Sequence, residues 1–114
     1  MDMTSIFKSA GQISDQEARE LLKQGAWLID VRTPEEFGAR HLAGAINVPL
    51  DALEVSVSKV VNDMAKPLLL YCASGMRSRL ALKILQDAGY ANVFDLGSYG
   101  RAEGVLNSNT TGYI

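Results

Sequence analysis

Residues 67–78 have the sequence PLLLYCASGMRS, in which an apolar run gives way at Cys72 to a short polar segment that contains Gly75. The apolar run predicts a buried β-strand, and the glycine with its polar neighbours predicts a loop. Cys72 is the only cysteine in the chain. A strand that ends on a lone thiol beside such a loop is typical of a site that holds a thiolate nucleophile.

A helix is expected directly after this loop. Over residues 76–88 the apolar side chains recur at helical spacing, and Gly89 provides a stop. The first turn of a helix has unpaired backbone N–H groups and the positive end of the helix dipole. We therefore expect the Cys72 sulfur to lie among these amides and to be substantially ionised at neutral pH. The alternative is that Cys72 is a small buried hydrophobic residue, but a plain core strand has no need of Gly75, Arg77 and Ser78 after it.

The rest of the chain alternates between predicted helices and short apolar strands. Ser14 with Glu17 and Thr33 with Glu36 both match the capping-box pattern of a helix start. The predicted helices span residues 14–24, 33–40, 53–64 and 76–88, and the predicted strands span residues 26–31, 45–48, 68–72 and 92–95. This order predicts an α/β fold with a mainly parallel central sheet and helices on both faces. Sites in such sheets lie at the carboxyl ends of the strands, where Cys72 falls.

The length and composition suit one domain. The chain has 114 residues, of which 47% are hydrophobic and 21% are charged, so we expect a single domain over residues 1–114 with a core at about 14–97. Glycine, serine, asparagine and threonine are frequent from Ser98 onward. They predict a loosely ordered C-terminal tail over residues 98–114, anchored by Leu106, Tyr113 and Ile114.

Charge and hydropathy exclude several classes of partner. A net charge of -2 without a long basic run argues against nucleic acid. No stretch approaches the roughly 20 apolar residues of a membrane span, and the first residues lack the pattern of a secretory signal. A lone cysteine cannot form an internal disulfide, which suits a reducing compartment. We therefore expect a cytoplasmic protein with no membrane partner.

Several blocks of the sequence resemble one known family. Residues 72–78 (CASGMRS) are similar to the active-site loop of single-domain rhodanese-like sulfurtransferases. Residues 28–37 (LIDVRTPEEF), 41–49 (HLAGAINVP) and 89–96 (GYANVFDL) resemble the family's other recurrent blocks in the same order. The resemblance covers most of residues 14–97 and implies a single rhodanese-like domain. Four residues depart from the family pattern, namely Arg40, the pair Ser98 and Tyr99, and Glu103. The resemblance therefore predicts less about the C-terminal packing.

The resemblance also implies a reaction and its residues. The Cys72 thiolate would take the outer sulfur of a small anionic donor such as thiosulfate and carry it as a persulfide. A thiophilic acceptor, which is cyanide, a small thiol or a thiol on a protein, would then remove the sulfur. The loop that would bind the substrate consists of Ala73, Ser74, Gly75, Met76, Arg77 and Ser78. No metal or organic cofactor is required.

The other polar residues have weaker expected roles. Asp30 and Arg32 end a strand at the same edge as Cys72, so we predict that they support the site, chiefly by a pairing that holds the next helix. Glu36 is a plausible partner for Arg32. Arg77 is expected to face an anionic substrate or the carbonyl groups of its own loop. His41 is an alternative general base, although a loop that ionises the thiol through amides needs none.

The length of the loop separates two enzyme classes. Cysteine-dependent phosphatases, including relatives with this fold, have five residues between cysteine and arginine, whereas residues 73–76 make four here. One residue is roughly 3.3–3.6 Å of extended chain, and the tighter loop suits one terminal sulfur better than a phosphoryl group. A non-catalytic rhodanese-like binding or regulatory module is the other alternative. The presence of both Cys72 and Arg77 favours an enzyme.

Overall fold

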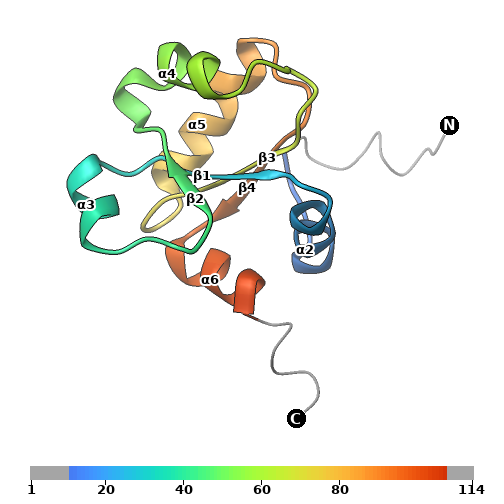
Figure 1. The fold of residues 1–114 in the computed structure, drawn as a ribbon, viewed down its shortest axis with the longest axis vertical. Helices are drawn as coiled ribbons and strands as arrows, with labels where there is room; N and C mark the ends of the chain where they lie inside the picture. The colour runs from blue at the N-terminus through green and yellow to red at the C-terminus, as the bar shows by residue number, and fades with distance from the viewer. Residues whose placement is uncertain (1–10, 108–114) are drawn as a thin grey trace, which may run out of the picture.

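The computed structural model describes residues 11–107, which form a central sheet between two layers of helices (Figure 1). The strands are β1 (Trp27–Asp30), β2 (Ala45–Asn47), β3 (Leu68–Tyr71) and β4 (Val93–Gly97). They lie in the order β2-β1-β3-β4, and every neighbouring pair is parallel. The prediction of a mainly parallel α/β sheet is confirmed.

The register brings the carboxyl ends of the strands to one edge. Asp30, the last residue of β1, lies opposite Asn47 of β2 and Tyr71 of β3. Tyr71 in turn pairs with Gly97, after an irregularity in the register between Leu70 and Tyr71. Cys72 follows Tyr71 directly, so the cysteine emerges at the edge where β1 and β4 also end.

Helices cover both faces of the sheet. Helix α4 (Leu53–Val60), which follows a 3₁₀ turn at Leu50–Ala52, and helix α5 (Met76–Asp87) lie on one face. Helices α2 (Asp15–Lys23) and α6 (Tyr99–Asn107) lie on the other face, and the short helix α3 (Pro34–Ala39) stands beyond the end of β1 (Figure 1). Within residues 11–107, no helix combines the length and the apolar character that crossing a bilayer demands.

The position of β3 in the sheet explains why residues 68–71 are all apolar and do not alternate with polar residues. Leu68 and Leu70 face the cluster beneath α4 and α5, and Leu69 and Tyr71 face the cluster beneath α2 and α6. All four side chains are fully buried, because helices cover both faces of this central strand. Cys72 continues the alternation and lies in the α4–α5 cluster.

Local signals at the helix starts are confirmed. The Ser14 side chain accepts from the Glu17 backbone amide and Glu17 reaches back to the Ser14 amide, which completes the predicted capping box of α2. Thr33 and Glu36 form the same box at α3, with Pro34 as the first helical residue. Helix α4, in contrast, ends at Val60 and not at residue 64, because the next residue, Val61, adopts an extended conformation.

The prediction of a loosely ordered tail is wrong for residues 99–107, which form α6. Ala102 and Val105 are fully buried against the sheet, and Leu106 packs beside them as predicted. Gly100, Gly104 and Asn107 lie on the exposed side of this helix, so composition concealed its apolar stripe. Tyr113 and Ile114 lie outside the described residues.

Candidate active site

Cys72 stands at the junction between β3 and the loop. Its backbone amide donates to the Gly97 carbonyl oxygen at 3.0 Å, which fixes the junction to the end of β4. Its side chain has no exposed surface. The thiol is therefore held at the sheet edge and shielded from bulk water.

Two backbone amides point at the Cys72 sulfur. The N–H groups of Gly75 and Ser78 donate to Sγ at 3.1 and 3.3 Å. Gly75 has φ +106° and ψ −10°, a left-handed conformation that turns the loop back toward the sulfur immediately before α5 begins. Because α5 starts at Met76, the sulfur also lies near the positive end of this helix. The arrangement favours negative charge on Sγ.

The loop is fixed to the β4–α6 connection. Ser78 is buried, and its Oγ lies 3.2 Å from the Gly75 carbonyl oxygen and 3.3 Å from that of Gly97. The Tyr99 amide donates to the Ala73 carbonyl oxygen at 3.1 Å, and Ser74 forms an isolated bridge with Ser98. The shape of the cysteine loop therefore depends on the chain around residue 98.

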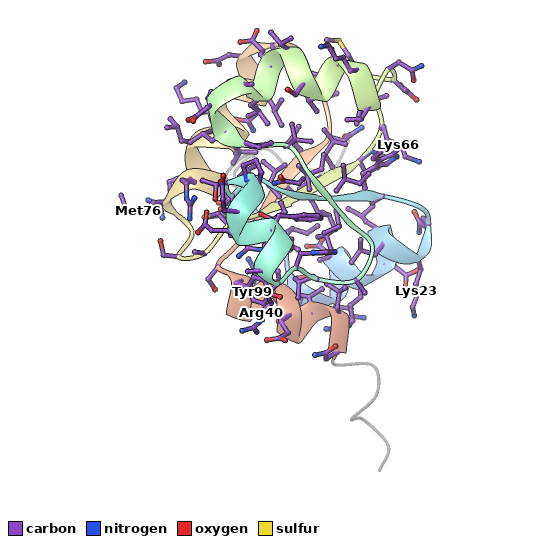
Figure 2. The ribbon with its side chains drawn as sticks, turned by 60° about the vertical axis from the view of Figure 1, so that its left-hand side comes forward. Lys23, Arg40, Lys66, Met76 and Tyr99 are labelled. Atoms are coloured by element: carbon purple, nitrogen blue, oxygen red, sulfur yellow. The ribbon has the colours of Figure 1, made fainter. Side chains whose placement is uncertain are left out.

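The outer residues of the loop point away from the sulfur. The Ala73 and Ser74 side chains are exposed, and Met76 is 78% exposed, projecting from the surface in Figure 2. These residues shape the loop through their backbones. Their side chains are accessible to a molecule that approaches the site.

Arg77 is paired in a way that the sequence did not indicate. Its Nη1 and Nη2 donate to Oε1 and Oε2 of Glu36 at 2.7 and 3.0 Å. The prediction that Glu36 pairs with Arg32 is wrong, because Arg32 forms its ion pair with Asp30 and Glu36 forms its ion pair with Arg77. The Arg77 guanidinium, followed by the Thr33 backbone amide, lowers the pKa of Glu36 to about 2, so the carboxylate stays ionised at neutral pH.

Asp30 and Arg32 form a buried ion pair at the end of β1. Arg32 Nη2 lies 2.7 Å from Asp30 Oδ2, and the Arg32 backbone amide also donates to Asp30, at 2.9 Å. The same Nη2 donates to the Arg40 carbonyl oxygen at 2.7 Å, at the end of α3. The hydrogen bonds that the Arg32 guanidinium donates to the Asp30 carboxylate raise the pKa of Arg32. The pair thus joins the end of β1 to α3, which carries Glu36.

His41 is tied to α3. Its Nδ1 lies 2.8 Å from the Phe37 carbonyl oxygen, and its ring stacks on the Phe37 ring with centroids 3.8 Å apart. The ring is exposed. Within residues 11–107, these contacts connect His41 to α3 and none connects it to the cysteine loop.

Arg40 contacts two of the other residues that depart from the family pattern, Tyr99 and Glu103. Arg40 Nε donates to the Tyr99 hydroxyl at 3.2 Å, its guanidinium carbon lies 4.5 Å from the centre of the Tyr99 ring, and its Nη2 lies 3.5 Å from Glu103 Oε1. Figure 2 shows Arg40 and Tyr99 together at the lower end of the molecule. Arg40, Tyr99 and Glu103 thus form one local cluster that joins the end of α3 to α6.

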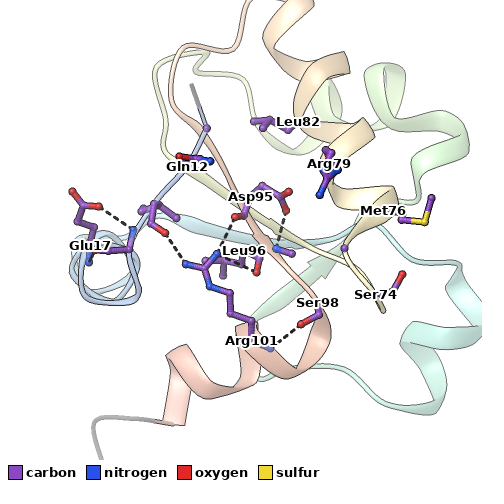
Figure 3. A pocket seen from close by; sticks show the side chains of 15 residues that line it. Gln12, Glu17, Ser74, Met76, Arg79, Leu82, Asp95, Leu96, Ser98 and Arg101 are labelled. Atoms are coloured by element: carbon purple, nitrogen blue, oxygen red, sulfur yellow. Dashed lines mark hydrogen bonds between the residues drawn. The ribbon is translucent and has the colours of Figure 1, made fainter. Parts of the chain in front are cut away.

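A pocket of about 830 Å³ opens on the flank of the cysteine loop (Figure 3). Ser74, Gly75 and Met76 of the loop form one wall, and Arg79 of α5 and Arg101 of α6 contribute charged side chains. The Arg101 guanidinium is already bound, since Nη2 donates to the Ile13 carbonyl oxygen at 2.6 Å. The pocket offers room for a small molecule beside the loop.

Sequence reasoning missed two contributors to the site. Glu36 was recognised as a helix cap but not as the partner of Arg77, and Gly97 supplies a carbonyl oxygen to both Cys72 and Ser78. Both contacts join segments distant in the sequence. The available signal for Glu36 was its local capping pattern, which accounts for its carboxylate without any need of Arg77.

The fold and the loop together define an α/β domain with a cysteine cradled by backbone amides at the carboxyl edge of a parallel sheet. A family model described as the rhodanese-like domain matches residues 14–99. The chain belongs to this family.

Known relatives agree with this assignment. The chain is 38% identical over 69 residues to thiosulfate sulfurtransferase PspE of Escherichia coli, a match that covers 60% of this chain and 66% of PspE. It is 31% identical over 85 residues to thiosulfate sulfurtransferase GlpE of Ectopseudomonas mendocina, covering 75% of this chain and 76% of GlpE. The match to PspE therefore spans slightly less than two thirds of that protein. A solved structure titled rhodanese with anions from E. coli superimposes with a TM-score of 0.65 at 34% identity, covering 68% of this chain and 91% of the other.

Proposed function

We propose that this protein is a sulfurtransferase that carries sulfane sulfur on Cys72. The observation that supports the proposal is the pair of backbone amides, from Gly75 and Ser78, that donate to Sγ. Such donors stabilise negative charge on sulfur as an oxyanion hole stabilises it on oxygen. They favour both the thiolate nucleophile and a persulfide anion.

The proposed reaction has two steps. The Cys72 thiolate attacks the outer sulfur of thiosulfate, the bond between the two sulfurs of the donor breaks, and sulfite leaves with the bonding electron pair. Cys72 is left as a persulfide anion. An acceptor, either cyanide or a thiol, then attacks the outer sulfur and restores the thiolate. Because the chain has no second cysteine, the acceptor must come from outside the chain.

Relatives and surroundings support the choice of substrates. PspE and GlpE are both named thiosulfate sulfurtransferases, and the E. coli rhodanese structure contains anions. The exposed outer face of the loop and the neighbouring pocket leave room for an acceptor thiol, including one on a partner protein. The proposal needs no metal or organic cofactor, and it suits a cytoplasmic location where thiols are abundant.

Mass spectrometry of the protein after thiosulfate treatment tests the proposal. We expect the mass to rise by one sulfur atom and to return to its starting value when cyanide is added, with release of thiocyanate. Cys72→Ser should abolish both events. Ser74→Ala, in the same loop but with an exposed side chain, is the matched control and should retain both.

Other outcomes of these assays would favour a phosphatase or a non-catalytic module over a sulfurtransferase. Unchanged turnover in Cys72→Ser would exclude the covalent mechanism. Hydrolysis of an aryl phosphate faster than sulfur transfer would indicate a phosphatase, despite the four-residue spacing between Cys72 and Arg77. A wild-type protein that acquires no sulfur from thiosulfate or an organic donor would indicate a non-catalytic module.

A further inference from the structure

Arg77, the only arginine in the loop of residues 72–78, is already paired with the carboxylate of Glu36. Glu36 accepts from both terminal nitrogens of Arg77, at 2.7 and 3.0 Å, so the guanidinium presents its bidentate face to a carboxylate of the same chain. Glu36 Oε1 also accepts from the Thr33 amide at 2.9 Å and lies 3.1 Å from the Thr33 hydroxyl. The carboxylate is thus held from two sides and is not a loosely placed surface group.

Two other arginines around the site, Arg32 and Arg40, are likewise paired. Arg32 pairs with the buried Asp30, and Arg40 lies 3.5 Å from Glu103. Arg79 points into the pocket on the flank of the loop (Figure 3). Arg79 is therefore a cation on the flank of the loop, whereas the guanidinium of Arg77 is occupied by the Glu36 carboxylate.

The local charge follows from these pairings. A Cys72 thiolate, Arg77 and Glu36 together carry one negative charge, whereas the thiolate and Arg77 alone would carry none. A dianion that approaches this site is repelled more than a monoanion. Two unit charges about 4 Å apart in water alter affinity by about fivefold, so the difference is measurable.

We propose that Glu36 sets the charge selectivity of the site: by occupying Arg77 it disfavours dianionic sulfur donors relative to donors of lower charge. This inference rests on the proposed sulfur transfer and specifies its donor class. The inference favours donors such as organic thiosulfonates or persulfides. These donors have at most one negative charge near the sulfur that is transferred. Glu36 acts through Arg77, so it is a positioning residue and not a catalytic one.

The variant Glu36→Gln separates this role from helix capping. Glutamine at the third helical position also completes a capping box, so the Thr33 contacts and α3 should survive. The test compares thiosulfate, a dianion, with methanethiosulfonate, a monoanion that also donates its outer sulfur and releases a sulfinate. Glu35→Gln removes the same charge from the neighbouring, exposed position of α3 and serves as the control.

We expect Glu36→Gln to raise the ratio of kcat/KM for thiosulfate to kcat/KM for methanethiosulfonate by about three- to tenfold. The change should appear as a lower KM for thiosulfate, with kcat for methanethiosulfonate close to that of the wild type. A merely structural role would lower both kcat values together. An unchanged ratio, or an equal change in Glu35→Gln, would overturn the inference.

A measurement on the wild-type protein keeps the inference testable if the variant does not fold. Because the Cys72 thiolate, Arg77 and Glu36 together carry one negative charge, raising the ionic strength from about 0.02 to about 0.2 M screens their repulsion of anions, so KM for thiosulfate should fall more than KM for methanethiosulfonate. A rise in KM for thiosulfate would indicate attraction by a free cation and would overturn the inference. If the wild type takes sulfur from neither donor, the proposed function itself fails; transfer from both without these charge effects refutes only the role of Glu36.

Discussion

Asp30 and Arg32 form a buried ion pair that connects the end of β1 to the end of α3. Arg32 Nη2 lies 2.7 Å from Asp30 Oδ2 and 2.7 Å from the Arg40 carbonyl oxygen, so one guanidinium holds both elements. Helix α3 also carries Glu36, which binds Arg77 of the cysteine loop. The sheet edge, α3 and the loop are therefore joined by two consecutive ion pairs, one buried and one half-exposed.

Asp30→Asn should lower the free energy of unfolding by about 3–5 kcal/mol, because it leaves the Arg32 guanidinium buried without its counter-ion. Urea denaturation at neutral pH measures the change. Asp51→Asn, at an exposed position, removes the same charge and should change stability by less than about 0.5 kcal/mol. Equal effects of the two substitutions would show that the buried pair does not stabilise the fold.

The ion pair of Glu36 should give a defined pH dependence. Its pKa falls from an ordinary value of 4.5 to about 2, because the folded state favours the carboxylate. The stabilisation is therefore complete above pH 4.5 and is lost as the pH falls through about 2. Urea denaturation of the wild type and Glu36→Gln across this range should show a stability difference that shrinks toward low pH. A difference that stays constant with pH would contradict the assignment.

Gly75→Ala should disturb the loop through its backbone and not through a collision. The nearest atoms to an added Cβ are 3.7 Å away, which is ordinary contact, but φ is +106°. An alanine in this left-handed region costs about 1–2 kcal/mol, so we expect lower stability and slower sulfur transfer. Gly104→Ala, in α6 with open space around it, should instead stabilise the protein by about 0.5–1 kcal/mol. Unfolding and sulfur-transfer assays on both variants check the contrast.

Arg101→Gln should weaken the attachment of α6. The guanidinium donates to the Ile13 carbonyl oxygen at 2.6 Å and to Asp15 Oδ1 at 3.1 Å, so it joins α6 to the segment that leads into α2. Loss of these charged hydrogen bonds should cost about 1–3 kcal/mol in unfolding free energy. The control is Arg79→Gln, an exposed arginine of α5, which should change stability by less than about 0.5 kcal/mol. Amide exchange in α6 should also accelerate in Arg101→Gln but not in the control.

The features that the sequence determined by itself are those with local causes. The capping boxes of α2 and α3 join residues three positions apart, and the helix after Cys72 follows from apolar spacing within twelve residues. The uninterrupted apolar run 68–71 was enough to identify the central buried strand. The position of the cysteine at the carboxyl end of that strand then located the site.

Tertiary structure decided what depends on segments that are distant along the chain. The sequence predicted Glu36 as part of the capping box of α3. In the folded protein Glu36 also pairs with Arg77, which is 41 residues away, and not with the nearby Arg32. Residues 99–107 were predicted to be a tail, but they form a helix because Ala102 and Val105 are buried against the sheet. Arg40, Tyr99 and Glu103 were separate departures until α3 and α6 met. A local sequence pattern indicates which kinds of partner a residue can pair with. Tertiary packing determines which of these partners lies within contact distance.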